Sequence, residues 1–249
     1  MNNESYLLEG ERLDDLQLCG YYLIQNPSLF CFGMDSVLLS NFAKVKKGGK
    51  MLDLCSGNGV IPILMSAKNK AESYKGIEYQ KQSVDMAERS IKLNGIEEKV
   101  SVVKGDILCI KDIEERGTYD TVTCNPPYML SGQGSENENE SLYIARHEVK
   151  CTLKDVFEAA SYALKYGGKF YMVHRPERLC DIMYFSRKYD MEVKKIRFVL
   201  PRENATPSLV LSEHIKGGKP SLDILPSFIV YDKNNNYTES FKNMYYGHL

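Results

Sequence analysis

The fold follows from Lys50-Met-Leu-Asp-Leu-Cys55 and the turn Ser56-Gly-Asn-Gly59 that comes directly after it. The first segment is apolar almost throughout, which is typical of a strand buried on both faces of a sheet. The turn with its two glycines and a mostly apolar segment from residue 60 to residue 70 then predict a strand, a turn and a helix in succession. Such a unit begins the alternation from which a parallel sheet is built.

The same alternation continues to about Tyr189. Further strands are expected at residues 73–78, 100–103, 119–124 and 169–173, and helices at 81–93, 153–164 and 178–188. Two long strands, 191–200 and 208–215, flank a turn rich in Pro, Asn and Thr, which predicts an antiparallel hairpin. The expected fold is therefore α/β, a doubly wound and mostly parallel sheet of seven strands with an antiparallel C-terminal hairpin.

Composition indicates a single globular unit. With 249 residues, 43% of them hydrophobic, the chain can bury one full core. The absence of internal repeats and linkers predicts one domain over residues 1–249, with an N-terminal extension at 1–45 and the core at 46–249. The net charge of −1 gives no overall attraction to nucleic acid or membrane, although Lys and Arg outnumber Asp and Glu between Lys165 and Lys219.

The cysteines and the N-terminus indicate the cellular location of the protein, and the histidines indicate whether it binds a metal. The seven cysteines include no Cys-x-x-Cys pair and are interpreted as reduced thiols. The start Met1 to Ser5 has no signal-peptide pattern, and no apolar run approaches the ~18 residues of a membrane span. The four histidines lack the spacing of metal ligands. We expect a cytoplasmic protein, monomeric, with no metal and no membrane association.

A second informative stretch is Asn125-Pro126-Pro127-Tyr128, which follows the strand expected at residues 119–124. The prolines fix φ and cannot continue the sheet ladder, so the Asn125 side chain and the Pro126 carbonyl are expected to be rigid acceptors for a planar amino group. Tyr128 would offer an aromatic face on which a base could stack. Asn-Pro-Pro is equally good turn chemistry, so the stretch alone leaves both interpretations open.

Polar residues and glycines also follow the first three strands. The first turn has Pro62 where a dinucleotide fingerprint needs its third glycine, so a pyrophosphate site is not expected. An amino-acid moiety carrying a sulfonium fits the acid and glycines of this turn better. The acid after the second strand could hold two ribose hydroxyls, and the pair after the third strand could bind and cover an adenine. These positions are Asp53, Gly57, Gly59, Glu78, Asp106 and Ile107.

This constellation resembles the class I S-adenosylmethionine-dependent methyltransferases, which have a Rossmann-like fold. Asn-Pro-Pro-Tyr is similar to the signature of those that methylate an sp2-attached amino nitrogen. The resemblance extends from about Phe30 to Tyr231 and implies S-adenosylmethionine as the cofactor. It implies that the methionine part contacts Asp53, Gly57 and Gly59, the ribose Glu78, the adenine Asp106 and Ile107, and the far side Asp35 within residues 32–39. It also implies catalytic roles for Asn125, Pro126, Pro127 and Tyr128.

Finer features resemble the bacterial tRNA (adenine-N6)-methyltransferases, which modify the adenine beside the anticodon of a valine tRNA. These features are Arg12 to Leu16, Gln25, Ala145 to Glu148, Lys216 to Gly218 and Pro226 to Tyr231. The resemblance implies tRNA as the partner. Arg146, Arg175 and Arg178 are candidates for contacts to its backbone. The acidic loop at residues 131–141 receives no binding role.

Other functions remain open from the sequence. An amide NH2 also fits the Asn-Pro-Pro-Tyr socket, so a glutamine-N5 methyltransferase acting on release factors is an alternative, as are enzymes that methylate amino groups of rRNA or DNA. Release-factor enzymes carry a helical recognition domain before the fold, and the segment before Asp53 is short and partly strand-like. An RNA-binding factor without turnover is a third alternative, against which the complete set of acidic and Asn residues argues.

Overall fold

The computed structural model describes residues 3–29, 31–68, 70–128 and 151–246. The strands of its main sheet are β3 (Lys50–Leu54), β4 (Ser73–Glu78), β5 (Val100–Lys104), β6 (Tyr119–Cys124), β7 (Leu164–His174), β8 (Met191–Leu200), β9 (Leu209–Lys216) and β10 (Asp223–Ile229). The helices are α1 (Met34–Phe42), α2 (Val60–Lys68), α3 (Lys81–Leu93), α4 (Ile110–Ile113), α6 (Leu153–Ala163), α7 (Leu179–Lys188) and α8 (Glu239–Tyr246). Short 3-10 turns lie at Asn3–Tyr6, Ile107–Cys109 and Pro176–Arg178.

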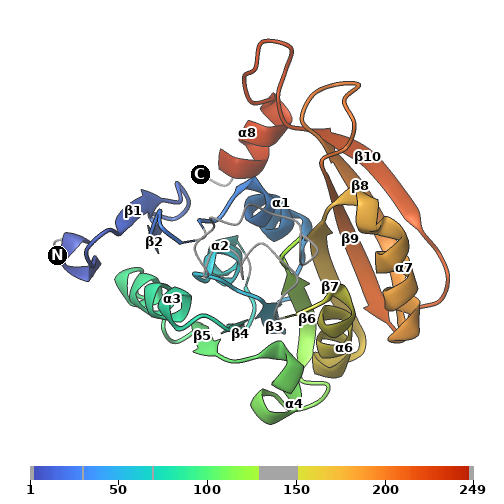
Figure 1. The fold of residues 1–249 in the computed structure, drawn as a ribbon, viewed down its shortest axis with the longest axis horizontal. Helices are drawn as coiled ribbons and strands as arrows, with labels where there is room; N and C mark the ends of the chain where they lie inside the picture. Colours follow the sequence, from blue (N-terminus) through green and yellow to red (C-terminus); the bar gives the residue numbers. More distant parts are fainter. Residues whose placement is uncertain (1–2, 30, 69, 129–150, 247–249) are drawn as a thin grey trace, which may run out of the picture.

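The main sheet has the order β10-β8-β9-β7-β6-β3-β4-β5. β9 is antiparallel to β7 and β8, and the remaining neighbouring pairs of this described sheet are parallel. Helices α1, α2 and α3 cover one face, and α4, α6 and α7 cover the other (Figure 1). The predicted doubly wound α/β fold with its antiparallel hairpin of β8 and β9 is confirmed.

The number of strands was predicted wrongly, since the sheet has eight strands and not seven. The additional strand is β10, which lies parallel to β8 at the edge of the sheet (Figure 1). Its residues are mostly exposed or half-buried, and its pairing shifts register between Leu225 and Phe228, on either side of Pro226. A proline tolerated at an edge and a weak apolar pattern leave little strand signal in the sequence.

Two cores lie on opposite faces of the sheet. The central strand β3 is buried along nearly its whole length because helices cover both of its faces, which explains its continuous apolar run. Met51 packs in the core beneath α1, α2 and α3, whereas Leu52 and Leu54 pack in the core beneath α6 and α7. Successive side chains of β3 therefore enter opposite cores, so the strand packs against both helical layers.

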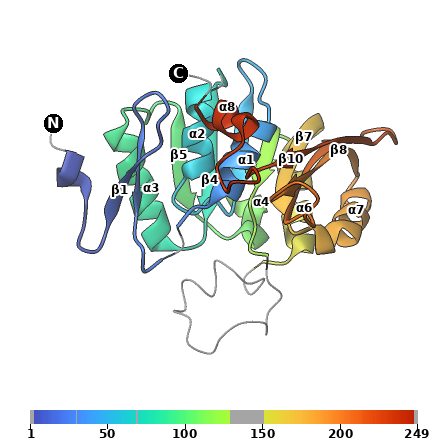
Figure 2. The same cartoon turned by 90° about the horizontal axis from the view of Figure 1, so that it is seen from above.

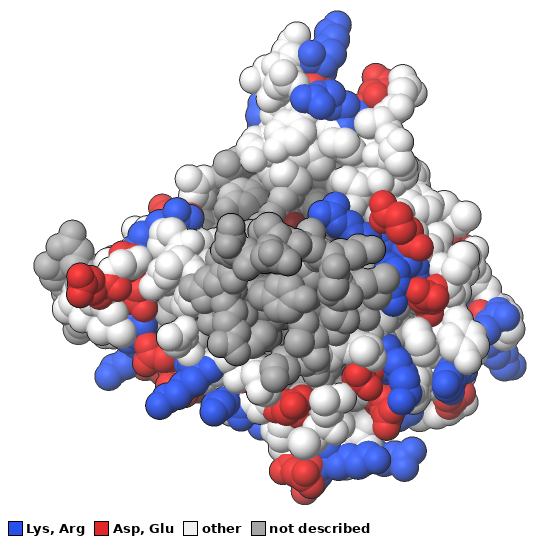
Figure 3. Space-filling model, viewed as in Figure 1, with Lys and Arg blue, Asp and Glu red and all other residues white. Residues whose placement is uncertain are grey.

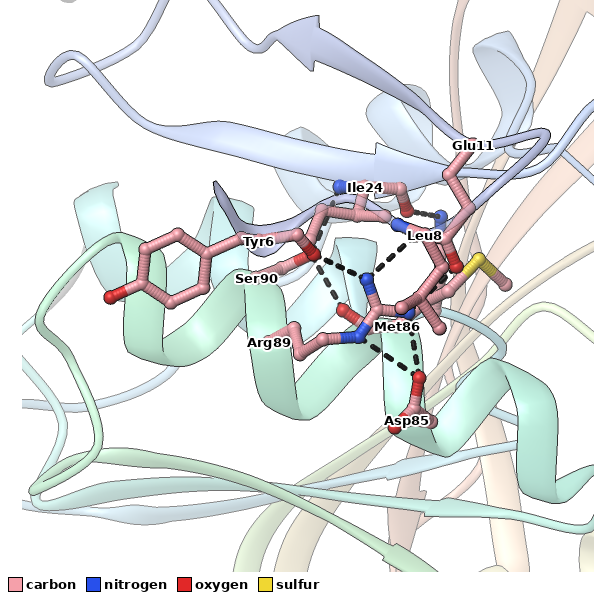
Figure 4. A network of polar contacts seen from close by, with 9 residues as sticks. Tyr6, Leu8, Glu11, Ile24, Asp85, Met86, Arg89 and Ser90 are labelled. Carbon is pink, nitrogen blue, oxygen red and sulfur yellow. Dashed lines mark hydrogen bonds and ion pairs between the residues drawn. The ribbon is translucent and has the colours of Figure 1, made fainter. Parts of the chain in front are cut away.

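The N-terminal segment forms a small antiparallel sheet of β1 (Arg12–Asp15) and β2 (Tyr22–Gln25) beside α3 (Figure 2). Arg89 of α3 holds this segment, because its guanidinium donates to both carboxylate oxygens of Glu11 at 2.6 Å and to the Tyr6 carbonyl at 2.6 Å (Figure 4). The Ser90 hydroxyl accepts the Ile24 amide at 2.9 Å. These bonds place residues 3–25 against the same helix that follows β4.

No helix within the described ranges is both long enough and apolar enough to cross a membrane. Within the same ranges, no group of three or more His, Cys, Asp or Glu side chains is arranged to hold a metal ion.

Candidate active site

A cavity of about 650 Å³ lies where β3, β4, β5 and β6 end. It is also lined by the first turn of α1 and by the residues after β7. In a parallel sheet the carboxyl ends of the strands are where ligands bind. Of the residues predicted for a site, those that line the cavity are Asp35, Gly57, Glu78, Asp106, Ile107, Asn125, Pro126, Pro127, Tyr128, Arg175 and Arg178.

Two predicted residues do not line the cavity. Asp53 is fully buried and lies behind the cavity wall. A side chain on Gly59 would meet Val102 at 3.1 Å and Ala87 at 3.2 Å, so this glycine permits close packing of α3 and β5. Arg146, like the acidic loop 131–141 and the segment Ala145 to Glu148, lies outside the described residues.

Glu78 and the first turn form one hydrogen-bonded unit. The two oxygens of the buried Glu78 carboxylate accept the backbone amides of Gly57 and Gln80, each at 2.8 Å. Burial raises the pKa of Glu78, and these backbone hydrogen bonds oppose the rise. Gly57 has a φ of +57°, and a Cβ added to it would meet no atom within 4 Å. The turn therefore keeps its shape through Glu78 and leaves space above Gly57.

Asp53 lies at the base of this turn and is unusual in its environment. One carboxylate oxygen accepts the Thr123 hydroxyl of the neighbouring strand at 2.5 Å. The other is buried and has no hydrogen-bond partner among the described residues. Desolvation raises the pKa of Asp53 to about 7, and the nearby Glu78 adds to the rise. Asp53 can therefore exist in either protonation state near neutral pH.

Asp106 and Ile107 form the cavity wall after β5. One oxygen of Asp106 accepts the Leu108 amide at 2.9 Å and caps the 3-10 turn Ile107–Cys109. Ile107 is buried and lines the cavity, so one apolar side chain is available to cover a ring. Gly105 leaves room for this wall, because a Cβ there would lie 2.6 Å from Ile113.

Asn125 to Tyr128 follow β6 and face α1. The Asn125 amide nitrogen donates to the Ser36 hydroxyl at 3.0 Å. The Tyr128 hydroxyl donates to an oxygen of Asp35 at 2.9 Å and also contacts the Asn125 side-chain oxygen. Both residues that α1 contributes, Asp35 and Ser36, line the cavity as well. The first turn of α1 and the Asn-Pro-Pro-Tyr stretch are thus linked by side-chain hydrogen bonds.

The Tyr128 ring is more enclosed than its position in the sequence suggests. The Arg175 guanidinium lies 5.5 Å from the ring centre, and the His174 ring meets it edge to face at 5.2 Å. Desolvation lowers the pKa of His174 to about 4, and the neighbouring Arg178 and Arg175 contribute to this shift. A neutral imidazole and a guanidinium therefore surround a ring that was predicted to be an open stacking face.

The arginines at the cavity rim differ in their pairing. The Arg175 guanidinium donates to the Ser208 carbonyl at 3.1 Å, and Arg178 forms an ion pair with Asp181 at 2.7 Å. On the face viewed in Figure 3, Lys and Arg side chains are intermixed with Asp and Glu. A polyanion would consequently meet individual basic residues there and not a continuous field of one sign.

Sequence reasoning gave no role to Ser36 or to two cysteines of the cavity wall. Ser36 follows Asp35 in the segment 32–39, and no local pattern identifies it as a partner of Asn125. Cys55, in the left-handed region at φ +56°, and Cys151 line the cavity with their sulfurs 3.8 Å apart. They are separated by 96 residues in the sequence, so their proximity appears only in the fold.

Comparison with known proteins agrees with this geometry. The family model described as methyltransferase small domain matches residues 23–183. The chain is similar to the tRNA1(Val) (adenine(37)-N6)-methyltransferase of Histophilus somni strain 129Pt, with 22% identity over 90% of this chain and 92% of the relative. The enzyme of the same name from Tolumonas auensis is 23% identical over 89% of this chain and 90% of the relative.

Solved structures show the same fold at low identity. A predicted O-methyltransferase from Agrobacterium tumefaciens, protein Atu636, has a TM-score of 0.69 and 19% identity, and the match covers 86% of this chain and 97% of that chain. M. jannaschii TYW2 in complex with AdoMet has a TM-score of 0.57 and 13% identity, with 85% and 89% covered.

Proposed function

Because the chain belongs to the methyltransferase small domain family, we propose that it transfers a methyl group from S-adenosylmethionine to the N6 amino group of an adenine in tRNA. The substrate is the adenine next to the anticodon of a valine tRNA. The names of the relatives from Histophilus somni and Tolumonas auensis support this choice. One observation carries the proposal: Asn125 and Pro126 line the same cavity as Gly57 and Glu78. An amine acceptor and a cofactor site therefore share one space.

The residues at the ends of β3 to β5 fit the cofactor. The space above Gly57 allows a ligand to approach the backbone closely, and the positive φ at this position favours a glycine. The Glu78 carboxylate accepts the backbone amides of Gly57 and Gln80, and its remaining acceptor capacity would serve a ribose hydroxyl. Asp106 and Ile107 would hold and cover the adenine. Asp53 does not line the cavity, so its charged form would favour the ammonium of the methionine part through its electrostatic field and not by contact.

When bound, the cofactor supplies an electrophilic methyl group on a sulfonium. The chain's own residues act on the amine. The Asn125 side-chain oxygen and the Pro126 carbonyl would accept the two amino hydrogens and draw the nitrogen out of conjugation with its ring. The proton is lost readily once the nitrogen carries a positive charge, so no strong base is needed among these residues. Most of the acceleration is then positioning and electrostatic stabilisation.

RNA as the substrate class has two supports. A base must leave its stack to reach the cavity, and unstacking costs about a few kcal/mol, less in a loop than in a duplex. Arg175 and Arg178 at the rim would contact phosphate groups of the loop.

The test uses purified protein, labelled cofactor and tRNA from a strain that lacks this gene. We expect the label in tRNA as N6-methyladenosine, identified by nucleoside mass spectrometry. Tyr128→Ala should lower turnover and leave cofactor affinity nearly unchanged. Label on a release factor and not on RNA would contradict the proposal and favour a glutamine-N5 methyltransferase.

A further inference from the structure

The hydroxyl of Tyr128 stands between two acceptors. One is the Asp35 carboxylate oxygen at 2.9 Å, and the other is the side-chain oxygen of Asn125. A phenol carries one hydrogen and can donate it to one of them at a time. Burial, followed by the nearby Asp35 carboxylate, raises the pKa of Tyr128, so the hydroxyl keeps this hydrogen at neutral pH.

The choice between the two acceptors matters for the amine. If Tyr128 donates to Asn125, its hydrogen takes up one lone pair of the amide oxygen. The oxygen is then a weaker acceptor for an incoming amino group. If Tyr128 donates to Asp35, its own lone pairs face the Asn125 oxygen. The local potential then becomes more negative and favours an N–H donor.

Asp35 is held in place to receive this hydrogen. Its other carboxylate oxygen accepts the Ser36 amide at 2.9 Å, which fixes the side chain to the start of α1. Gly33 leaves room for it, because a Cβ there would lie 2.9 Å from the Asp35 oxygen. A carboxylate is a stronger acceptor than a neutral amide, so the hydrogen is drawn towards Asp35.

We propose that Asp35 is a positioning residue that draws the Tyr128 hydroxyl away from Asn125 and thereby frees the amide oxygen for the substrate amine. Ser36 complements it, because its hydroxyl accepts the Asn125 amide nitrogen and keeps the amide oxygen on the amine side. This inference rests on the proposed amino-methyltransferase function. It gives Asp35 a task in addition to any contact with the cofactor, and it makes the first turn of α1 part of the amine socket.

The decisive variant is Asp35→Asn. The asparagine keeps the shape and can still accept the Ser36 amide, but its NH2 would donate to the Tyr128 oxygen. The Tyr128 hydrogen would then turn to Asn125. We expect turnover on tRNA to fall roughly ten- to a hundredfold, because a charge-assisted hydrogen bond is replaced by one that blocks the acceptor. Adding Tyr128→Phe removes the blocking hydrogen, so Asp35→Asn with Tyr128→Phe should recover turnover to about the level of Tyr128→Phe alone.

Cofactor affinity and a second variant complete the test. Calorimetry with S-adenosylmethionine should give similar affinities for Asp35→Asn with and without Tyr128→Phe. Asp35→Ala should behave like Asp35→Asn and be rescued in the same way. Glu239→Ala, which removes an exposed first-turn carboxylate of α8 outside the cavity lining, is the matched control.

The possible outcomes separate the two proposals. Rescue by Tyr128→Phe supports the inference, because a purely structural or cofactor-binding Asp35 gives a defect that loss of a tyrosine hydroxyl cannot repair. An active wild-type enzyme with an unrescued double variant overturns the inference alone. A wild-type enzyme that methylates no RNA overturns the proposed function and the inference together.

Discussion

The two sides of the cavity are held by different kinds of interaction. On the side of β3 and β4, the backbone amides of Gly57 and Gln80 fix the carboxylate of Glu78. On the side of β6, side chains hold one another, since Asn125 bonds to Ser36 and Tyr128 to Asp35. Backbone amides cannot rearrange without unfolding the turn, whereas hydroxyls and carboxamides can exchange partners. In the proposed function the side of β3 and β4 is the cofactor side and the side of β6 is the amine side. We therefore expect the cofactor side to be preformed and the amine side to receive its substrate by exchanging hydrogen bonds.

The largest effect should come from the amine side. Asn125→Ala removes the acceptor that draws on the amino group, and we expect turnover on tRNA to fall by about a hundred- to a thousandfold, as for the loss of a preorganised polar group. Cofactor affinity measured by calorimetry should change little, because the Asn125 side chain bonds to Ser36 and Tyr128, whereas Glu78 holds the first turn. Equal losses of turnover and cofactor affinity would contradict the assignment of separate residues to the cofactor and to the amine.

The cofactor side is tested by Glu78→Ala. This change removes the carboxylate that would bind the ribose and releases the Gly57 and Gln80 amides. We expect cofactor affinity to fall by about ten- to a hundredfold, the range for hydrogen bonds to a charged group. Glu78→Gln is the matched variant and should lose less, because its amide oxygen still accepts one of the two backbone amides. A Glu78→Ala protein with normal affinity would show that the turn does not depend on this carboxylate.

The stability of the cofactor side should depend on pH through Asp53. Its pKa is about 7 in the fold, above the ordinary value of 3.8. A raised carboxyl pKa means that the folded state holds the proton more tightly, so this contribution is complete below the ordinary pKa and is lost as pH rises through 7. Between about pH 5 and pH 8, the stability of wild type relative to Asp53→Asn should fall by roughly 2 to 3 kcal/mol.

Urea unfolding of both proteins at the two pH values measures this difference. Subtracting Asp53→Asn removes the contributions of titrating groups that are not coupled to Asp53, so the difference reports Asp53 together with its interaction with Glu78. A difference that stays constant with pH would show that Asp53 titrates in its ordinary range.

The contrast between regular backbone structure and side-chain hydrogen bonds also explains which parts of the fold and the site the sequence could predict. The bounds of β4 and β6 and of α3 agree with prediction, because buried strands and an amphipathic helix leave strong periodic patterns. Gly167 and Gly168 fall between the helix expected at 153–164 and the strand expected at 169–173, but they lie inside β7, which starts at Leu164 directly after α6. The pairing of β6 with β7 shifts register there, so the glycines mark an irregular strand start.

For the site, the order of glycines and acids along the sheet edge predicted four residues that line the cavity, Gly57, Glu78, Asp106 and Ile107, but also Asp53 and Gly59, which do not. Which residues form hydrogen bonds with Asn125 and Tyr128 could not be predicted. The sequence predicted a stacking role for the Tyr128 ring and no role for its hydroxyl, which contacts both Asp35 and Asn125. Side-chain hydrogen bonds between segments 89 and 93 residues apart have no periodicity for the sequence to display.

The smallest effect concerns the arginines next to the amine side. Arg178→Ala should weaken tRNA binding by roughly threefold and reduce the slope of log affinity against log salt by about one, if Arg178 gives one phosphate contact. Its ion pair with Asp181 competes with the phosphate, which keeps the effect small. Asp181→Ala removes this competitor and should therefore strengthen binding slightly.

The control is Arg202→Ala. Arg202 is bonded to Asn235 and does not line the cavity, so this change should leave the slope unchanged. The measurement is fluorescence anisotropy with labelled tRNA over a salt series. An unchanged slope for Arg178→Ala would place the RNA backbone away from the residues after β7. The amine side would then have to receive its substrate from the direction of α1.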